Sequence, residues 1–189
     1  MSDDTGSTLL RPSLWLRGGV LLAVLVISLI IALNHDQLRE FKTLGYAGIF
    51  LIMLLSNATV ILPAPGLMFV FALGSTFNPI LIGFSAAAGG ALGEMTGYLT
   101  GYSGLAVLEN STAVNRIKLW MQHNGGLTIL LLSTIPNPLF DVAGILAGTS
   151  QMRVRRFLGA VFCGKLIQGI LIALAGKWSL DWVRDLVAP

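Results

Sequence analysis

Two long apolar stretches of the chain are each broken by a pair of prolines, and these breaks limit the possible folds more than any other feature. In the later stretch, nine residues (127–135) precede the sequence PNP and twelve residues (139–150) follow it. A proline inside a helix removes a backbone N–H and clashes with the preceding turn, so the helix ends there. Each piece is too short to cross a bilayer, which requires about 20 residues of helix.

The earlier stretch has the same organisation. Apolar residues 46–62 lead to the sequence PAPG, and 67–77 follow before an Asn-Pro pair. These eleven residues of helix rise about 16 Å, which is half of a hydrocarbon core of about 30 Å. We therefore predict two re-entrant hairpins, near residues 46–77 and 126–150. Their breaks are formed by Pro63, Pro65 and Gly66 and by Pro136, Asn137 and Pro138.

Both breaks lie in sequence that is too apolar for a water-soluble protein. Apolar residues make up 54% of the 189 residues and charged residues only 11%, whereas a soluble domain has about 25% charged residues. The chain is therefore predicted to be an integral membrane protein.

The sequence lacks the patterns of several other functional classes. It contains no nucleophile–base arrangement, no phosphate-binding glycine loop and no nucleic-acid-binding pattern, and neither histidine has partners at ligand spacing. We expect no enzyme activity, cofactor, bound metal or nucleic-acid partner. The single cysteine, Cys163, excludes an intrachain disulfide. Its apolar neighbours predict a small side chain packed inside a helix.

The N-terminal region contains one further apolar run. We predict a transmembrane helix at residues 14–34, preceded by a disordered cytoplasmic tail at 1–13. The alternative is a cleaved signal peptide, although no typical cleavage site follows the run. The mixed-charge residues after it form either an interfacial helix or a plain loop.

Two more spans are expected within a membrane domain that covers residues 35–176. They lie at 80–108, after the first hairpin, and at 157–176, after the second. A C-terminal tail is predicted at 177–189.

Basic residues flank the later hairpin on both sides, with Arg116 and Lys118 before it and Arg153, Arg155 and Arg156 after it. The positive-inside rule places both flanks in the cytoplasm. A broken segment that starts and ends on the same side is a re-entrant hairpin. The side on which the C-terminus lies stays open.

The two broken segments resemble each other. Both contain P-x-P, then an Ala/Leu/Gly cluster, at an offset of about 73 residues, and a long apolar run follows each. One crossing separates them, so they must enter from opposite faces. The predicted fold is therefore an all-α integral membrane protein with two inverted re-entrant hairpins, each followed by a spanning helix, plus the N-terminal transmembrane helix. The alternative is that the two P-x-P sequences coincide by chance.

Three ionisable residues are expected at membrane depth: Glu94, Asp141 and Lys165, with Gln168 one turn after the lysine. A charge at the centre of a membrane helix costs about 2.5–3.5 kcal/mol on insertion scales, so such residues pair or line a water path. Two interpretations stay open. The charges either form a structural pair that holds helices together, or they line a translocation path with an exchangeable proton.

Small residues recur every fourth position through the run at 80–108. Gly89, Gly93, Gly97 and Gly101 form a ladder that lets another helix approach closely, within the chain or between chains in a homo-oligomer. Glu94, Tyr98 and Tyr102 form the neighbouring stripe. A phenol on this stripe can donate a hydrogen bond to the carboxylate.

These motifs resemble a known family. GALGEMTGYLTGYSG is similar to a signature of the DedA/VTT superfamily, also called the SNARE-associated membrane proteins, and STIPNPLFDVAGILAG followed by FLGAVFCGK is similar to its vacuole membrane protein branch. The resemblance covers roughly residues 45–176. It implies two opposed re-entrant hairpins and a lipid-moving activity, namely phospholipid scrambling in eukaryotic members and translocation of polyprenyl-phosphate carriers in bacterial ones. The matching positions are Glu94, Gly97, Tyr98, Pro136, Asn137, Pro138, Asp141 and Lys165.

The sequence also departs from the bacterial members of that family. Where those carry acids around the first break, this chain has Ser56-Asn57 and Gly66-Leu67, and an arginine position is Tyr102. The STIP sequence of the second hairpin also lacks an arginine. Because the resemblance links those groups to proton coupling and phosphate recognition, their absence favours passive scrambling or a substrate with a different head group.

We therefore predict a membrane lipid scramblase or lipid translocator with a polar furrow between the hairpins. Membrane lipids are the expected partners, with protons as a second candidate, and the short chain favours a prokaryotic cell (inner) membrane. Two alternatives stay open: a proton-coupled secondary transporter of a polyprenyl-phosphate carrier or small ion, and a non-transporting scaffold or assembly protein. The predicted path residues are Glu94, Tyr98, Pro136, Asn137, Pro138, Asp141 and Lys165.

Overall fold

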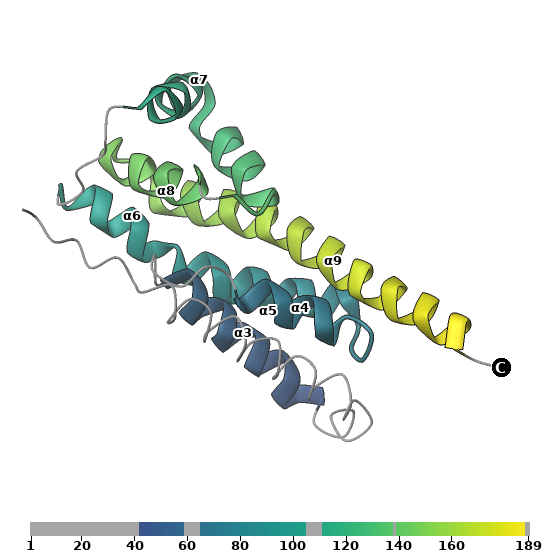
Figure 1. The fold of residues 1–189 in the computed structure, drawn as a ribbon. Coiled ribbons are helices and arrows are strands. Elements are labelled where there is room, and N and C mark those ends of the chain that lie inside the picture. Colours follow the sequence, from purple (N-terminus) through teal and green to yellow (C-terminus); the bar gives the residue numbers. More distant parts are fainter. Residues whose placement is uncertain (1–41, 59–64, 105–110, 138, 188–189) are drawn as a thin grey trace, which may run out of the picture.

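The computed structural model describes residues 42–58, 65–104, 111–137 and 139–187 of the chain (Figure 1). All regular structure in these ranges is α-helical, which confirms the predicted all-α class. The predicted N-terminal helix and tail, together with Pro63 and Pro138, lie outside the described residues. The helices are α3 (Lys42–Ala58), α4 (Pro65–Leu73), α5 (Pro79–Gly93), α6 (Met95–Tyr102), α7 (Thr112–Thr134), α8 (Leu139–Thr149) and α9 (Val154–Val187).

Helices end at both proline breaks, as the sequence predicts. The helix α3 ends at Ala58 and α4 begins at Pro65, a position where the missing N–H of proline costs nothing because the first N–H groups of a helix have no partner within it. At the second break, α7 ends at Thr134 and α8 begins at Leu139. The helices that follow the breaks, α4 and α8, have only 9 and 11 residues.

The helices of the two halves pair in the same pattern. We use the term long helices for the two that follow the hairpin-like segments, namely α5 with its continuation α6, and α9. The helix before each break packs along the long helix of its own half, so α3 lies on α5 and α7 lies on α9. The short helix after each break packs on the other half, so α4 lies on α9 and α8 lies on α6. The long helices α5 and α9 also pack against each other, which joins the halves (Figure 1).

Within the described residues, one helical segment is long and apolar enough to cross a membrane. It is Val154–Ser179, the larger part of α9. The segment predicted as a C-terminal tail continues this helix as far as Val187. Cys163 is exposed on α9, so the prediction of a packed cysteine is wrong. The sequence pattern did not show that this part of a membrane helix faces away from the other helices.

The span predicted at 80–108 is two helices in line, α5 and α6, separated by Glu94. The backbone of Glu94 keeps a helical conformation, with φ −66° and ψ −12°. Its N–H donates to the Gly90 carbonyl at 3.0 Å, and the Tyr98 N–H donates to the Glu94 carbonyl at 3.2 Å. The chain therefore keeps its direction through this residue (Figure 1).

The helix α7 bends at Asn124, whose φ of −152° and ψ of 86° are not helical. The Asn124 side chain accepts hydrogen bonds from the Leu127 N–H at 3.2 Å and from Arg156 Nη2 at 3.0 Å. The later arm of α7 therefore starts after Asn124, and the bend is attached to the basic start of α9.

The buried apolar side chains form two clusters, and each contains helices from both halves. One cluster gathers α3, α4, the start of α5 and the later part of α9, and includes Ile49, Val70, Ile82 and Ala173. The other gathers α6, α7, α8 and the start of α9, and includes Tyr98, Ile129, Ala147 and Phe157. Many large apolar side chains remain exposed, as a lipid-facing surface requires, among them Phe84, Leu99, Leu131 and Leu171.

The glycine ladder divides at Glu94 between two partner helices. A Cβ at Gly89 would overlap the Phe50 carbonyl of α3, and one at Gly93 would lie 2.5 Å from the Leu54 carbonyl. Beyond Glu94, a Cβ at Gly101 would overlap the carbonyl of Ile145 on α8.

Gly97 differs from the prediction, because a Cβ there would have no atom within 4 Å. It lies on the stretch of α6 that follows the contacts with α3 and precedes the close approach of Gly101 to α8. The sequence spacing predicts one continuous packing face. The partner helix changes from α3 to α8 at Glu94, and this change leaves Gly97 without a close neighbour.

We expect Gly89→Ala to lower stability and Gly97→Ala to leave it equal or higher. The added methyl group at Gly89 meets backbone of α3, and such overpacking costs about 1–3 kcal/mol. At Gly97 it meets open space and gains about 0.5–1 kcal/mol of helix preference. Thermal unfolding in detergent, followed by tryptophan fluorescence, measures both. Equal unfolding temperatures for the two variants would contradict the close packing of α3 on α5.

Candidate functional site

A buried ion pair joins the two long helices. Lys165 on α9 and Glu94 between α5 and α6 approach to 3.0 Å between Nζ and Oε1, and their side chains are 8% and 7% exposed. A buried charge without a partner costs several kcal/mol, so each residue makes the other tolerable. The structure therefore brings two of the predicted ionisable residues together.

The ammonium group of Lys165 also donates a hydrogen bond to Asn57 Oδ1, at 2.5 Å. Asn57 lies in the last turn of α3, and its own Nδ2 donates to the Met53 carbonyl at 2.6 Å, which fixes the orientation of the amide. The first break is thereby tied to α9. In the sequence, Asn57 is distinguished only as a departure from the family pattern. The signal that could have assigned it a role is a polar residue in an apolar run just before PAP.

Two glycines make room for this arrangement. A Cβ at Gly90 would lie 2.7 Å from Lys165 Cδ, so only glycine lets the lysine stem cross α5 toward Asn57. A Cβ at Gly164 would overlap Ser133 Oγ and lie 2.6 Å from the Leu130 carbonyl, so this glycine lets the end of α7 rest on α9. The GK pair of the sequence therefore brings the second break next to the lysine.

At the second break, the Asn137 side chain closes the end of α7. Its Nδ2 donates to the carbonyls of Leu132 at 2.9 Å and Ile135 at 2.7 Å. These are groups that a helix end leaves without partners. Its Oδ1 is buried and accepts no hydrogen bond within the part of the chain that the structure describes. Pro136, beside it, is exposed.

The start of α8 brings two more side chains to the same region. The ring centre of Phe140, a buried residue, lies 5.3 Å from Lys165 Nζ, within the range of a cation–π contact. Asp141 lies in the first turn of α8, where the helix dipole favours a negative charge. It is exposed and interacts electrostatically with Lys165 and Glu94. Among the described residues it forms no ion pair.

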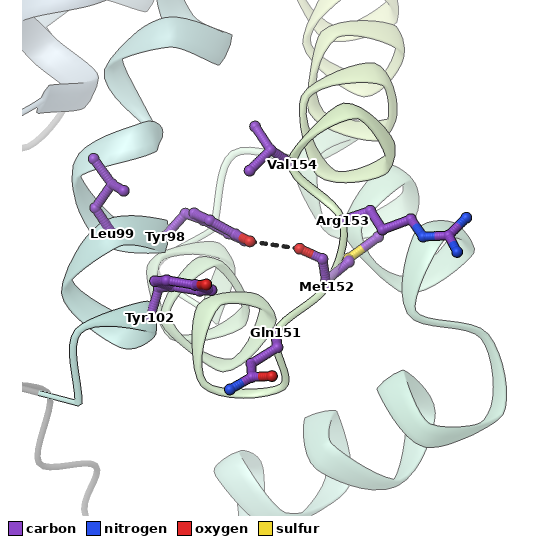
Figure 2. Close-up of a pocket in the computed structure, with 7 residues that line it drawn as sticks. All are labelled: Tyr98, Leu99, Tyr102, Gln151, Met152, Arg153 and Val154. Carbon is purple, nitrogen blue, oxygen red and sulfur yellow. Dashed lines mark hydrogen bonds between the residues drawn. The ribbon is translucent and has the colours of Figure 1, made fainter.

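Tyr98 lies apart from this cluster. Its hydroxyl donates to the Met152 carbonyl at 2.5 Å, so it serves the α8–α9 connection and not the Glu94 carboxylate. Its ring contacts Phe157 at a centroid distance of 4.9 Å and stacks on Tyr102 at 6.1 Å. Tyr98 also lines an open cleft of about 450 Å³ (Figure 2). The other lining residues are Leu99, Tyr102, Gln151, Met152, Arg153 and Val154.

The arrangement is a polar cluster where the two breaks and the two long helices meet. We call it the central cluster and define it as Asn57, Glu94, Asn137, Asp141 and Lys165. Asn57, Glu94 and Lys165 are in direct contact, and Asp141 interacts electrostatically with the pair. Asn137 is included by its position in the chain, between Ser133 beside Gly164 and Phe140 beside Lys165. It holds the ammonium group of Lys165 in place. It also presents the exposed carboxylate of Asp141 and the amide oxygen of Asn137, which has no partner among the described residues. In the described ranges, no three His, Cys, Asp or Glu side chains gather as a metal site would require.

The family model of the VTT domain matches residues 64–177. The chain belongs to this family. It is similar to two proteins from Arabidopsis thaliana, "Vacuole membrane protein KMS1", 36% identical over 85 residues, and "Vacuole membrane protein KMS2", 37% identical over 82 residues. These matches cover 40% and 38% of this chain and 20% of each relative, so the chain matches about a fifth of their length. No solved structure matches.

These similarities confirm the predicted family and its vacuole membrane protein branch. The VTT-domain chain is a membrane protein. Because both relatives come from a plant, they give no support to the predicted prokaryotic inner membrane.

We expect Lys165→Met to destabilise the protein more than the double variant Glu94→Gln/Lys165→Met. The single change leaves the Glu94 carboxylate buried without its partner, which typically costs about 3–5 kcal/mol. The double change removes both charges and keeps similar volumes. Thermal unfolding in detergent provides the comparison. A single variant as stable as the double variant would show that Glu94 does not depend on Lys165.

Proposed function

We propose that this VTT-domain protein moves lipid head groups between the two leaflets of a membrane, as a scramblase or lipid translocator. The observation that carries the proposal is the central cluster. Its side chains come from both proline breaks and both long helices, and they are polar residues within apolar stretches of the sequence. Polar residues inside membrane proteins are rare and mark pathways for ions or substrates.

The helix lengths support re-entrant hairpins. Helices of 9 and 11 residues rise about 14 and 17 Å, well short of a hydrocarbon core of about 30 Å. We propose that α3–α4 and α7–α8 dip into the membrane from opposite faces. The exchanged packing of α4 and α8 supports such an inverted repeat. Transport sites commonly lie near the midplane between repeats of this kind.

Close glycine contacts repeat this exchanged pattern. A Cβ at Gly74, directly after α4, would overlap the Ala173 carbonyl of α9, and a Cβ at Gly176 of α9 would overlap the Phe71 carbonyl of α4. The helices α6 and α8 approach each other through Gly101 and Gly148 in the same reciprocal way. Both short helices are thus held by backbone contact to the opposite half, as an inverted repeat requires.

The proposed path runs beside Asp141. Because this carboxylate is exposed and forms no ion pair among the described residues, it can interact with a passing head group. The Glu94–Lys165 pair is already satisfied and holds the long helices together on the inner side of the path. The head group moves along the polar residues while its acyl chains stay in the bilayer.

We expect the protein in liposomes to exchange a fluorescent head-group lipid between leaflets. Dithionite should then bleach both leaflets, whereas protein-free liposomes lose only the outer signal. Asp141→Asn should slow the exchange about fivefold, the effect of losing roughly 1 kcal/mol of stabilisation in the rate-limiting step. Arg116→Gln is the matched control, because it removes an exposed charge on α7 away from the central cluster, and its rate should be unchanged. Bleaching of the outer leaflet alone would refute the proposal.

The buried carboxylate of Glu94 favours one alternative, a proton-coupled secondary transporter. That function requires uptake of a polyprenyl-phosphate carrier or small ion that depends on a pH gradient and is abolished by Glu94→Gln. The scaffold alternative requires that no substrate moves and that changes in the central cluster affect stability only. The liposome assay with and without a pH gradient separates the three functions.

A further inference from the structure

The hydrogen bonds of Lys165 are distributed unequally between the two breaks. An ammonium group has three N–H donors. One interacts with Glu94, and another is donated to Asn57 at the first break. The second break offers an equivalent amide oxygen, Asn137 Oδ1, which has no partner among the described residues. Each break thus provides one asparagine oxygen, and Lys165 bonds only the one at the first break.

The orientation of the Asn137 amide is fixed by its two hydrogen bonds. Turning it over would place Oδ1 against the carbonyl oxygens of Leu132 and Ile135, which would repel it. A buried acceptor without a partner costs about 1–3 kcal/mol, and such groups are rare in folded proteins. Because this oxygen is sealed from solvent, a donor from inside the protein is the economical solution.

Two buried donors on α9 are candidates, Lys165 and Gln168. Lys165 is the better placed. Its Nζ lies 5.3 Å from the ring centre of Phe140, three residues after Asn137. The contact of Gly164 with Ser133 holds the end of α7 beside the same turn of α9. The flexible four-carbon stem of lysine lets its ammonium group move between neighbouring acceptors.

We propose that Lys165 transfers its second hydrogen bond between Asn57 at the first break and Asn137 at the second, while it keeps its ion pair with Glu94. The described structure is the state in which the first break is attached to α9. From the position in which it bonds Asn57, the ammonium group does not reach Asn137 Oδ1, so it must move to use a donor there. Transfer therefore releases Asn57 and engages Asn137. The ion pair persists, so neither state leaves a buried charge unpaired.

The two states differ by the exchange of one amide acceptor for another. Their free energies are therefore expected to lie close together, so that both states are populated. Each transfer frees the asparagine side chain at one break and ties the asparagine at the other to α9. The purpose of this transfer rests on the proposed function, in which it would open the lipid path to one face of the membrane at a time. Its test measures the accessibility of the breaks and does not require lipid movement.

The test uses reporter cysteines in a Cys163→Ser background, which removes the single native cysteine. Ser56→Cys reports on the first break and Thr134→Cys on the second, and both positions are half-buried. The protein is placed in liposomes, and the labelling rate with a water-soluble maleimide is measured. Each asparagine variant is assessed at the break that it does not touch.

Asn137→Leu should slow labelling of Cys at position 56, because Lys165 then stays at the first break. Asn57→Leu should slow labelling at position 134, because Lys165 then stays at the second. We expect changes of about five- to tenfold, the factor that a lost hydrogen bond of about 1–1.4 kcal/mol gives in an equilibrium constant. Asn57→Asp strengthens the first position of Lys165 and should instead speed labelling at 134.

The matched control is Gln168→Leu, which removes the other buried donor on α9 and should leave both rates unchanged. Unchanged labelling at 56 in Asn137→Leu would overturn the proposal. This is the result expected if a trapped water, and not Lys165, bonds Asn137 Oδ1. A response of Gln168→Leu equal to that of Asn137→Leu would also overturn it. If Asn137→Leu fails to fold, the opposite effects of Asn57→Leu and Asn57→Asp at position 134 still decide.

Discussion

A positive charge inside an apolar protein must be surrounded by acceptors, and the position of Lys165 sets this requirement for the whole fold. Glu94 supplies the opposite charge from the other long helix, and Asn57 supplies an amide oxygen from the first break. Gly90 and Gly164 exist as glycines because the lysine stem and the end of α7 occupy the space where their side chains would be. The packing of α5 on α9, and the approach of both breaks to this point, follow from the same need.

The two breaks are bonded unequally to the rest of the fold. Buried polar atoms without a partner are rare in folded proteins, because each such atom weakens the fold. Among the described residues, Asn137 Oδ1 has no partner and Asp141 is exposed, and both lie at the second break or just after it. Lys165 therefore bonds Asn57 at the first break, and the second break carries polar groups that remain available for interaction.

The sequence predicted much of the fold because proline, glycine and charge act locally. The ends of α3 and α7 at the breaks follow from proline chemistry, and Glu94 and Lys165 follow from the cost of charge in lipid. The role of Asn57 and the position of Tyr98 were not predictable in this way, because a hydrogen-bond partner depends on which helices meet in space. The open position at Gly97 has the same cause, since spacing shows a face but does not show which helix covers each part of it.

The length of α9 has a consequence for the membrane in which the protein works. Its candidate segment of 26 residues carries Arg155, Arg156 and Lys177 near its ends, so the run between these charges is 157–176. Twenty residues of helix rise about 30 Å, which equals the thickness of an average hydrocarbon layer. The helix therefore fits such a layer with little tilt, and the exposed indole of Trp178 is suited to the headgroup region at one end. A thinner bilayer would tilt α9 relative to its neighbours, so a change in acyl-chain length acts directly on the helix that carries the lysine.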